Sequence, residues 1–227
     1  MVFYKTVALA NKDLFDIKIT DTYTAKVSLD IDTLIDALAL LKNKNVIFIG
    51  GPGAGKGTRI GALTQLGLYV SHLSTGDALR AEVARGTDLG KEVAPLMAAG
   101  DYVPDELLNP IVKNFIDAHK GMTVIFDGYP RTTSQAEYLY EEGVEVDLVI
   151  VLDVKEETIL QRLIENTREG RTDDDPKVAS KRFKKFEKET KGPLVEAYAD
   201  KVVRVNVDNG LEQDLPELLD KIVAFFN

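Results

Sequence analysis

The sequence predicts an α/β fold in which helices flank a five-stranded parallel sheet. Three observations predict it: short apolar runs, helical periodicity between them, and a glycine-rich segment between the first run and a helix. Alternating strands and helices form parallel sheets with right-handed crossovers. Several of the runs are continuously apolar, as strands covered on both faces are. The runs are residues 45–50, 67–73, 122–128, 147–153 and 201–207.

Two of the intervening stretches show the helical period most clearly. Residues 104–118 and the last stretch, 211–223, place apolar side chains three and four positions apart, which is typical of an amphipathic helix. We find no internal repeat and no low-complexity tract.

Residues 1–44 follow another pattern and are expected to form a small N-terminal unit before a domain spanning 45–227. Apolar residues alternate with polar ones in 15–20 and again in 23–31, which indicates a β-hairpin. A helix with an apolar body at 34–41 is expected next, capped by Asp30 or Asp32. A further strand is expected within residues 2–9.

Composition excludes several classes of function. The net charge is −9, whereas nucleic-acid binding requires a basic face. No apolar run approaches the roughly 18 residues that span a membrane. We therefore expect the chain to bind neither nucleic acid nor a membrane. The chain has no cysteine, which excludes disulfides and thiolate metal sites. Its first residues lack the features of signal and transit peptides, so a cytoplasmic protein is expected.

The segment GGPGAGKGT follows the first apolar run directly and contains five glycines. Gly50, Gly55 and Lys56 match the P-loop spacing G-x-x-x-x-G-K. Glycines let backbone N–H groups approach a phosphate, and the following helix N-terminus adds positive charge. The strict pattern continues with Ser or Thr, but this chain has Gly57 and places Thr58 one position later.

Other interpretations of the glycine loop fit the sequence less well than a nucleoside triphosphate site does. A dinucleotide-binding G-x-G-x-x-G cannot be laid over these residues. The Asn-Lys pairs that could start a GTPase base-reading motif fall at 11–12 and 43–44, both before the loop. A glycine-rich turn that binds nothing explains neither the strand context nor the lysine.

Three further stretches complete a resemblance to the nucleoside monophosphate kinases. LSTGDALRAEV (73–83), FDGYPRTTSQAE (126–137) and GRTDDDPKVASKRF (170–183) follow the loop in the family's order. With the displaced threonine, residues 45–227 resemble the adenylate kinase family. The resemblance implies the three-layer P-loop fold of these kinases, a monophosphate-binding flap at about 74–103 and a short lid at about 163–176. It implies Mg²⁺-dependent ATP + AMP ⇌ 2 ADP, with no structural zinc because the lid is short and cysteine-free.

The resemblance also assigns site residues. It implies catalytic roles for Lys56, Asp127, Arg131, Arg171 and Arg182. It implies ATP binding by Gly51, Gly53, Ala54, Gly55, Lys56, Gly57, Thr58, Arg162 and Asn209. It implies AMP binding by Thr75, Arg80, Val103, Gly128, Arg131, Gln135, Arg171 and Arg182. It implies Mg²⁺ held through water near Thr58 and Asp127.

These residue types suit the chemistry. The acceptor is itself a phosphate, mostly ionised near pH 7, so the site needs little base catalysis and much positive charge. Guanidinium groups are always charged and bind phosphate with two parallel hydrogen bonds. A few converging cations therefore allow an acidic chain to bind nucleotides.

Two residues bear on the acceptor base. The resemblance places Thr75 at a position where relatives that phosphorylate UMP and CMP have alanine. It places Gln135 at the position of the glutamine that recognises adenine in the family. A glutamine amide offers the donor and the acceptor that adenine complements. AMP is therefore the expected acceptor, and a UMP/CMP kinase is the alternative. A non-catalytic nucleotide sensor is the alternative from another class.

The chain departs from the family in two places. A second arginine is usual where this chain has Asn166, and Arg168 is a candidate substitute. Asp173 and Asp174 match the paired acids of short lids. The second departure is the N-terminal unit, which we expect to bind a protein partner, a second copy of the chain or the chain's own core.

Overall fold

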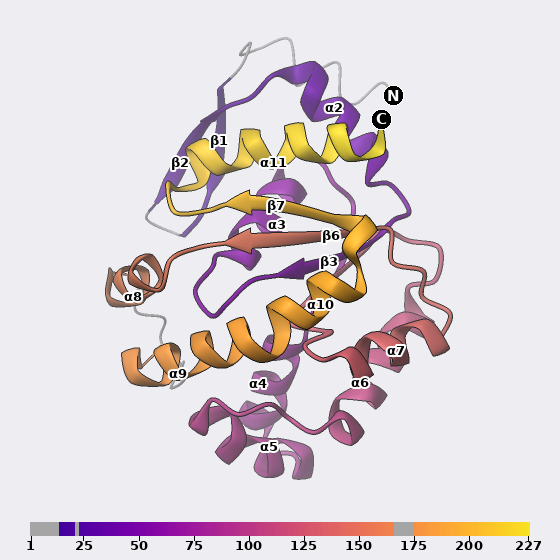
Figure 1. The fold of residues 1–227 in the computed structure, drawn as a ribbon, viewed down its shortest axis with the longest axis vertical. Helices are drawn as coiled ribbons and strands as arrows, with labels where there is room; N and C mark the ends of the chain where they lie inside the picture. Colours follow the sequence, from indigo (N-terminus) through magenta and orange to yellow (C-terminus); the bar gives the residue numbers. More distant parts are fainter. Residues whose placement is uncertain (1–13, 21–22, 166–174) are drawn as a thin grey trace.

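A computed structural model describes residues 14–20, 23–165 and 175–227, and Figure 1 shows its fold. The strands are β1 (Leu14–Lys18), β2 (Thr24–Ser28), β3 (Asn45–Ile49), β4 (Ser71–Ser74), β5 (Val124–Asp127), β6 (Leu148–Asp153) and β7 (Val202–Asn206). The helices are α2 (Ile31–Leu40), α3 (Lys56–Gln65), α4 (Thr75–Arg85), α5 (Asp88–Ala99), α6 (Asp105–Ala118), α7 (Thr133–Glu141), α8 (Glu156–Glu165), α9 (Pro176–Phe186), α10 (Gly192–Ala197) and α11 (Leu211–Phe226). A π-helical turn, η2 (Glu187–Lys191), joins α9 to α10, and a 3-10 turn, η3 (Ala199–Lys201), precedes β7.

The predicted fold class is confirmed. Five strands form one sheet in the order β4-β5-β3-β6-β7, and every neighbouring pair in it is parallel. Strand β3 is central, and its Val46 pairs with Ile125 on one side and Leu148 on the other. The carboxyl ends of parallel strands, where ligands bind in open α/β sheets, therefore meet around the end of β3.

Local sequence explains where the elements begin and end. Ser74 and Thr87 cap α4 and α5 by accepting hydrogen bonds from backbone N–H groups. Gly86 and Gly100 end the same helices in the left-handed conformation. The strand expected at 67–73 begins only at Ser71, because Gly67 has a φ of 110° and the preceding residues form the turn that ends α3.

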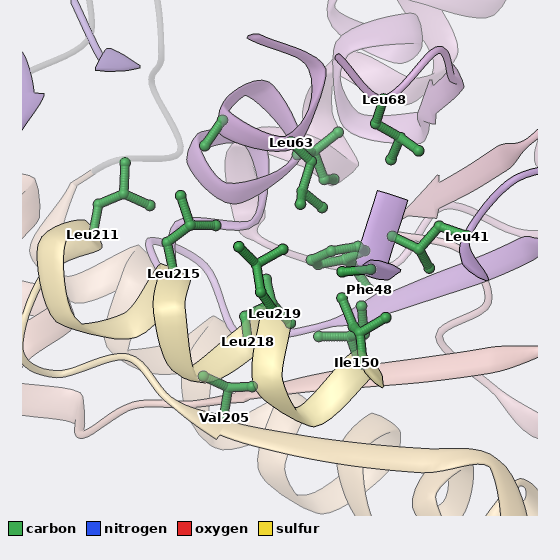
Figure 2. Packing of buried hydrophobic residues seen from close by; sticks show 14 of the residues in the cluster. Leu41, Phe48, Leu63, Leu68, Ile150, Val205, Leu211, Leu215, Leu218 and Leu219 are labelled. Carbon is green, nitrogen blue, oxygen red and sulfur yellow. The ribbon is translucent and has the colours of Figure 1, made fainter. Parts of the chain in front are cut away.

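The sheet divides the hydrophobic core into two clusters by alternation along its strands. In β3, Val46 and Phe48 face one cluster, whereas Ile47 and Ile49 face the other. In β6, Ile150 belongs to the first cluster. The first cluster is covered by α3 and α11, and Figure 2 shows Leu215 and Leu219 of α11 directed toward the side of Leu63 and Phe48. The second is covered by α6, α7 and α10.

The described part of the N-terminal unit packs onto this core. Strands β1 and β2 pair antiparallel, and Asp30 caps α2 by accepting from the N–H of Thr33 at 2.8 Å. Its buried apolar side chains belong to the same cluster as α11: Ile17, Ala25, Val27, Leu29, Leu34, Ala37, Leu38 and Leu41. The strand expected at 2–9 lies outside the described residues. In the described part of the chain, no helix is long and apolar enough to cross a membrane.

Candidate active site

The glycine loop has the geometry of an anion site. It runs from the end of β3 to the start of α3 at Lys56, and Gly53 and Gly55 adopt positive φ values of 75° and 82°. Gly55 caps α3 without a side-chain hydrogen bond, so the first N–H groups of the helix remain oriented toward a ligand. A Cβ at Gly51 would lie 3.1 Å from Phe183, which shows how closely α9 covers the loop.

Lys56 is held at the mouth of the loop. Its Nζ donates to the carbonyl of Gly50 at 2.8 Å and lies 3.7 Å from Oδ1 of Asp127. Burial lowers the pKa of Lys56, and repulsion by Arg131 and Arg182 lowers it further, while Asp127 partly compensates. A bound anion would relieve this excess of positive charge.

Asp127 ends β5. Among the ion pairs of the described residues, it is the acid that pairs with Lys56. Burial raises the pKa of Asp127, but the charges of Lys56, His72 and Arg131 outweigh it, so the net pKa is below the ordinary value. Nε2 of His72 lies 3.6 Å from Oδ2 of Asp127. His72 was not predicted, because only the β4–β5 pairing brings it beside Asp127.

The residues present fit a hydrated Mg²⁺ ion. Asp127 is an ionised, mostly buried carboxylate with 12% of its side chain exposed, and Thr58 lies in the first turn of α3. Within the described ranges, no group of three or more histidine or acidic side chains could enclose a metal ion. Magnesium retains several water molecules and takes few protein oxygens, so one carboxylate and one hydroxyl suit it.

One pocket contains most of the residues expected to bind AMP. It lies between helices α4 and α5 of the expected flap, the start of α6 and helix α9. Its lining includes Thr75, Arg80, Val103, Arg131, Gln135 and Arg182. The pocket therefore brings together residues that are more than a hundred positions apart in the chain, while their role in binding AMP stays a prediction.

Gln135 and Thr75 are held firmly in this pocket. Both are 2% exposed. The Gln135 side chain accepts from the N–H of Arg131 at 2.7 Å and donates to Asp105 at 2.6 Å. An amide can make about four hydrogen bonds, so one donor and one acceptor remain for a base. Asp105 was not predicted, because nothing in the sequence links it to Gln135. Thr75 donates to the carbonyl of Gly128 at 2.9 Å.

Arg131 is fixed beside Gly128. Its Nε donates to the Gly128 carbonyl at 2.8 Å, and a Cβ at Gly128, where φ is 79°, would lie 3.1 Å from its guanidinium. Burial and the charge of Arg182 lower the pKa of Arg131, although an arginine remains protonated at any physiological pH.

A second pocket adjoins the first and contains several of the groups expected to bind phosphate. Its lining includes Gly50, Gly51, Lys56, Tyr102, Gly128, Arg131 and Arg182. Tyr102, Arg131 and Arg182 line both pockets. The Tyr102 ring lies 5.5 Å from the Arg131 guanidinium, and its hydroxyl is 2.7 Å from that of Thr190. Tyr102 was not predicted, since a tyrosine in a loop carries no distinctive pattern.

The other predicted residues lie beside these pockets, in the loop or outside the described part of the chain. Arg162 on α8 donates to the carbonyl of Val207, beside the connection between β7 and α11 that contains Asn209. Arg80 pairs with Asp77 within α4 at 2.5 Å, and Ala54 and Gly57 lie in the loop and the first turn of α3. Most of the expected lid, with Asn166, Arg168, Arg171, Asp173 and Asp174, lies outside the described residues.

The fold and the site define the chain as a P-loop phosphotransferase with adjoining binding pockets. The adenylate kinase family model matches residues 48–203. The adenylate kinase of Deinococcus radiodurans is 43% identical over 169 residues, covering 70% of this chain and 85% of that protein. Those of Thermus thermophilus and Bacteroides thetaiotaomicron are 42% and 35% identical, covering 72% and 78% of this chain and 87% and 99% of those proteins. The chain belongs to the adenylate kinase family.

Proposed function

We propose that the chain catalyses the Mg²⁺-dependent reaction ATP + AMP ⇌ 2 ADP. The observation that carries this proposal is the pair of adjoining pockets that share Arg131 and Arg182. One pocket opens onto the glycine loop and Lys56, and the other contains Thr75 and Gln135. Two phosphorylated ligands in these pockets would direct their phosphates toward the same cations.

The shared cations perform the electrostatic part of the mechanism. Donor and acceptor phosphates repel each other, so a site that brings them together must supply positive charge at the point of transfer. Lys56 would bind the distal donor phosphates after exchanging its loop carbonyls for them, and Arg131 and Arg182 would neutralise both ligands. Because the acceptor is already anionic near pH 7, no side chain has to remove a proton from it.

Asp127 and Thr58 would hold the magnesium ion through its water ligands. The ion would neutralise charge on the donor phosphates. Asp127 is suited to this role because its lowered pKa keeps it ionised throughout the neutral range.

Adenine specificity is assigned to Gln135 and Thr75. The remaining donor and acceptor of the Gln135 amide complement the adenine edge. Asp105 fixes the orientation of that amide through its 2.6 Å hydrogen bond. A UMP/CMP kinase is the alternative acceptor assignment.

An assay of ADP formation with Mg·ATP and AMP, GMP, CMP or UMP tests the proposal. Strong turnover with AMP alone is the expected result. Preference for UMP or CMP would contradict the assignment of Gln135 and Thr75 but not the enzyme class. Binding of ATP without turnover of any acceptor would instead favour a nucleotide sensor.

Lys56→Met tests the mechanism. We expect transfer to fall about 100-fold or more, because an electrostatic group at the transferring phosphate is removed. Lys120→Met, the same change at a lysine whose side chain is 70% exposed, serves as the control. Near-normal turnover in Lys56→Met would contradict the mechanism.

The cytoplasmic location remains a proposal for cell fractionation to test.

A further inference from the structure

A buried ion pair joins α3 to α11 outside both pockets. Arg59 on α3 and Asp214 on α11 are only 3% and 1% exposed, and their side chains form a direct hydrogen-bonded ion pair. Neither residue lines a pocket described above. A buried ion pair is often no more stable than an apolar pair of similar volume, so its presence beside the active site calls for another explanation.

The guanidinium of Arg59 lies directly beneath the ATP-binding loop. Its Nη1 is 3.4 Å from the carbonyl oxygen of Ala54 and 3.3 Å from that of Gly55, and it donates to both. A Cβ built at Gly55 would lie 2.1 Å from the same nitrogen. The arginine therefore fills the space that the absence of a Gly55 side chain leaves.

These two hydrogen bonds constrain the opposite side of the loop. A trans peptide is planar, so its carbonyl oxygen and the following N–H point in opposite directions. When Arg59 holds the carbonyls of Ala54 and Gly55 on the buried side, the N–H groups of Gly55 and Lys56 face the cleft. Those are the groups through which a P-loop binds phosphate.

Asp214 determines where the guanidinium can lie. It accepts from Nη2 of Arg59, whereas Nε of Arg59 has no hydrogen-bond partner among the described residues. The position of the arginine therefore depends mainly on Asp214 and the loop. Helix α11 is in turn fixed by the N-terminal unit, since Tyr23 donates to Glu212 at 2.6 Å and β2 and α2 pack against α11.

We propose that Arg59 and Asp214 are positioning residues that orient the N–H groups of the loop toward the phosphates of ATP. The proposal rests on the proposed function only in taking ATP as the ligand of the loop. The described part of the N-terminal unit supports the same arrangement through α11, which would give it a part in nucleotide binding.

The test replaces the pair without leaving a buried charge. In Arg59→Met/Asp214→Leu both partners become apolar, a change that buried ion pairs often tolerate. Titration calorimetry of the full chain would measure the dissociation constants for Mg·ATP and, separately, for AMP. We expect ATP affinity to fall about tenfold, as the loss of two hydrogen bonds implies, and AMP affinity to change less than about twofold.

A control and a second variant keep the test decisive. Lys113→Met/Glu142→Leu removes an ion pair between α6 and α7 that does not contact the loop and should leave both affinities unchanged. If the apolar double variant does not fold, Asp214→Asn keeps the shape and a hydrogen-bond acceptor, and it should show a smaller loss confined to ATP.

Two outcomes would overturn the proposal. One is a folded double variant with unchanged ATP affinity, and the other is an equal loss for ATP and AMP, which would indicate a general effect on the fold. Binding of ATP alone requires no turnover. An inactive wild-type chain that binds ATP would therefore refute the proposed function while leaving this test intact.

Discussion

Two regions are attached to opposite ends of the molecule, and they are joined to it in different ways. Figure 1 shows the N-terminal hairpin and α2 beside α11 at one end, and the flap helices α4 and α5 at the other. The first region contributes Val27, Leu38 and Leu41 to the cluster that contains α11. Helices α4 and α5 contribute Leu79 and Val93 to the second cluster, but their far end meets α9 through polar contacts, where Lys181 donates to Asp101 at 3.1 Å and to the carbonyl of Ala99 at 2.9 Å.

This difference concerns how readily each contact can open. Apolar burial is lost in proportion to the area exposed to water, so an apolar contact of many side chains opens only at a large cost in free energy. Polar contacts at the surface exchange with water for little net free energy. The described part of the N-terminal unit is therefore held by apolar burial, whereas the contact of the expected flap with α9 can open at little cost in free energy.

Truncating a buried side chain of the N-terminal unit should have the largest effect. Leu41 is 1% exposed, and Leu41→Ala should lower the free energy of unfolding by about 2–5 kcal/mol, from lost burial and the cavity left behind. Ile35 lies on α2, the helix that Leu41 ends, and is 37% exposed. Ile35→Ala should therefore change the free energy of unfolding by about 0.5 kcal/mol or less. Urea denaturation measures both. Equal effects would mean that the unit is not part of the cooperative core.

Amide hydrogen exchange should separate the two regions without mutation. We expect amides of β2 and α2 to exchange only through opening close to global unfolding, and those of α4 and α5 through smaller local openings. Mass spectrometry of peptides from each region measures the rates. Faster exchange in α2 than in α5 would reverse the comparison.

A smaller effect is expected from the contact between flap and α9. Lys181→Met removes the hydrogen bonds to Asp101 and Ala99, and it should raise the KM for AMP about two- to fivefold while changing stability by about 1 kcal/mol or less. Lys177→Met, at an exposed lysine one turn earlier on α9, is the matched control. An unchanged KM would show that the contact does not influence acceptor binding.

The smallest expected effect is a shift in one titration. The hydrogen bond and the charge of Lys181 lower the pKa of Asp101. The folded pKa therefore lies below the unfolded value of about 3.9, so the contact is fully formed above that pH and is lost as pH falls through the folded pKa. Carbon NMR of the Asp101 carboxyl should show a lowered midpoint that Lys181→Met returns toward about 3.9. A midpoint unaffected by this change would exclude the lysine as its cause.

The sequence predicted what short-range patterns encode. The strand, glycine loop and helix around Lys56 lie within residues 45–65, and residue order alone predicts their chemistry. The hairpin was predicted for the same reason, and so was a cap of α2 at Asp30 or Asp32, of which Asp30 is the one observed. The strand at 67–73 was placed too early, because apolar composition cannot show that Gly67 adopts a positive φ.

Tertiary contacts account for what was missed. Asp105 reaches Gln135 only because α6 and α7 lie side by side. Arg59 reaches Asp214 only because α11 packs beside α3. Such pairs are separated by 30 and 155 positions, and their residue types are ordinary for helices. Three options remained open for the N-terminal unit, because an apolar stripe does not identify the surface that covers it. The described residues pack on the chain's own core, while partner binding and self-association remain to be tested.

The packing of α2 and β2 on α11 also bears on synthesis of the chain. About 180 residues separate Leu29 from Leu211, its companion in the same cluster. At about 5–20 residues per second, the ribosome would need roughly 10–40 s to deliver α11 after the hairpin has emerged. A two-stranded hairpin is at best marginally stable alone. The hairpin is therefore completed by a segment made about 180 residues later, and the nascent chain must keep an apolar surface from aggregating throughout that interval.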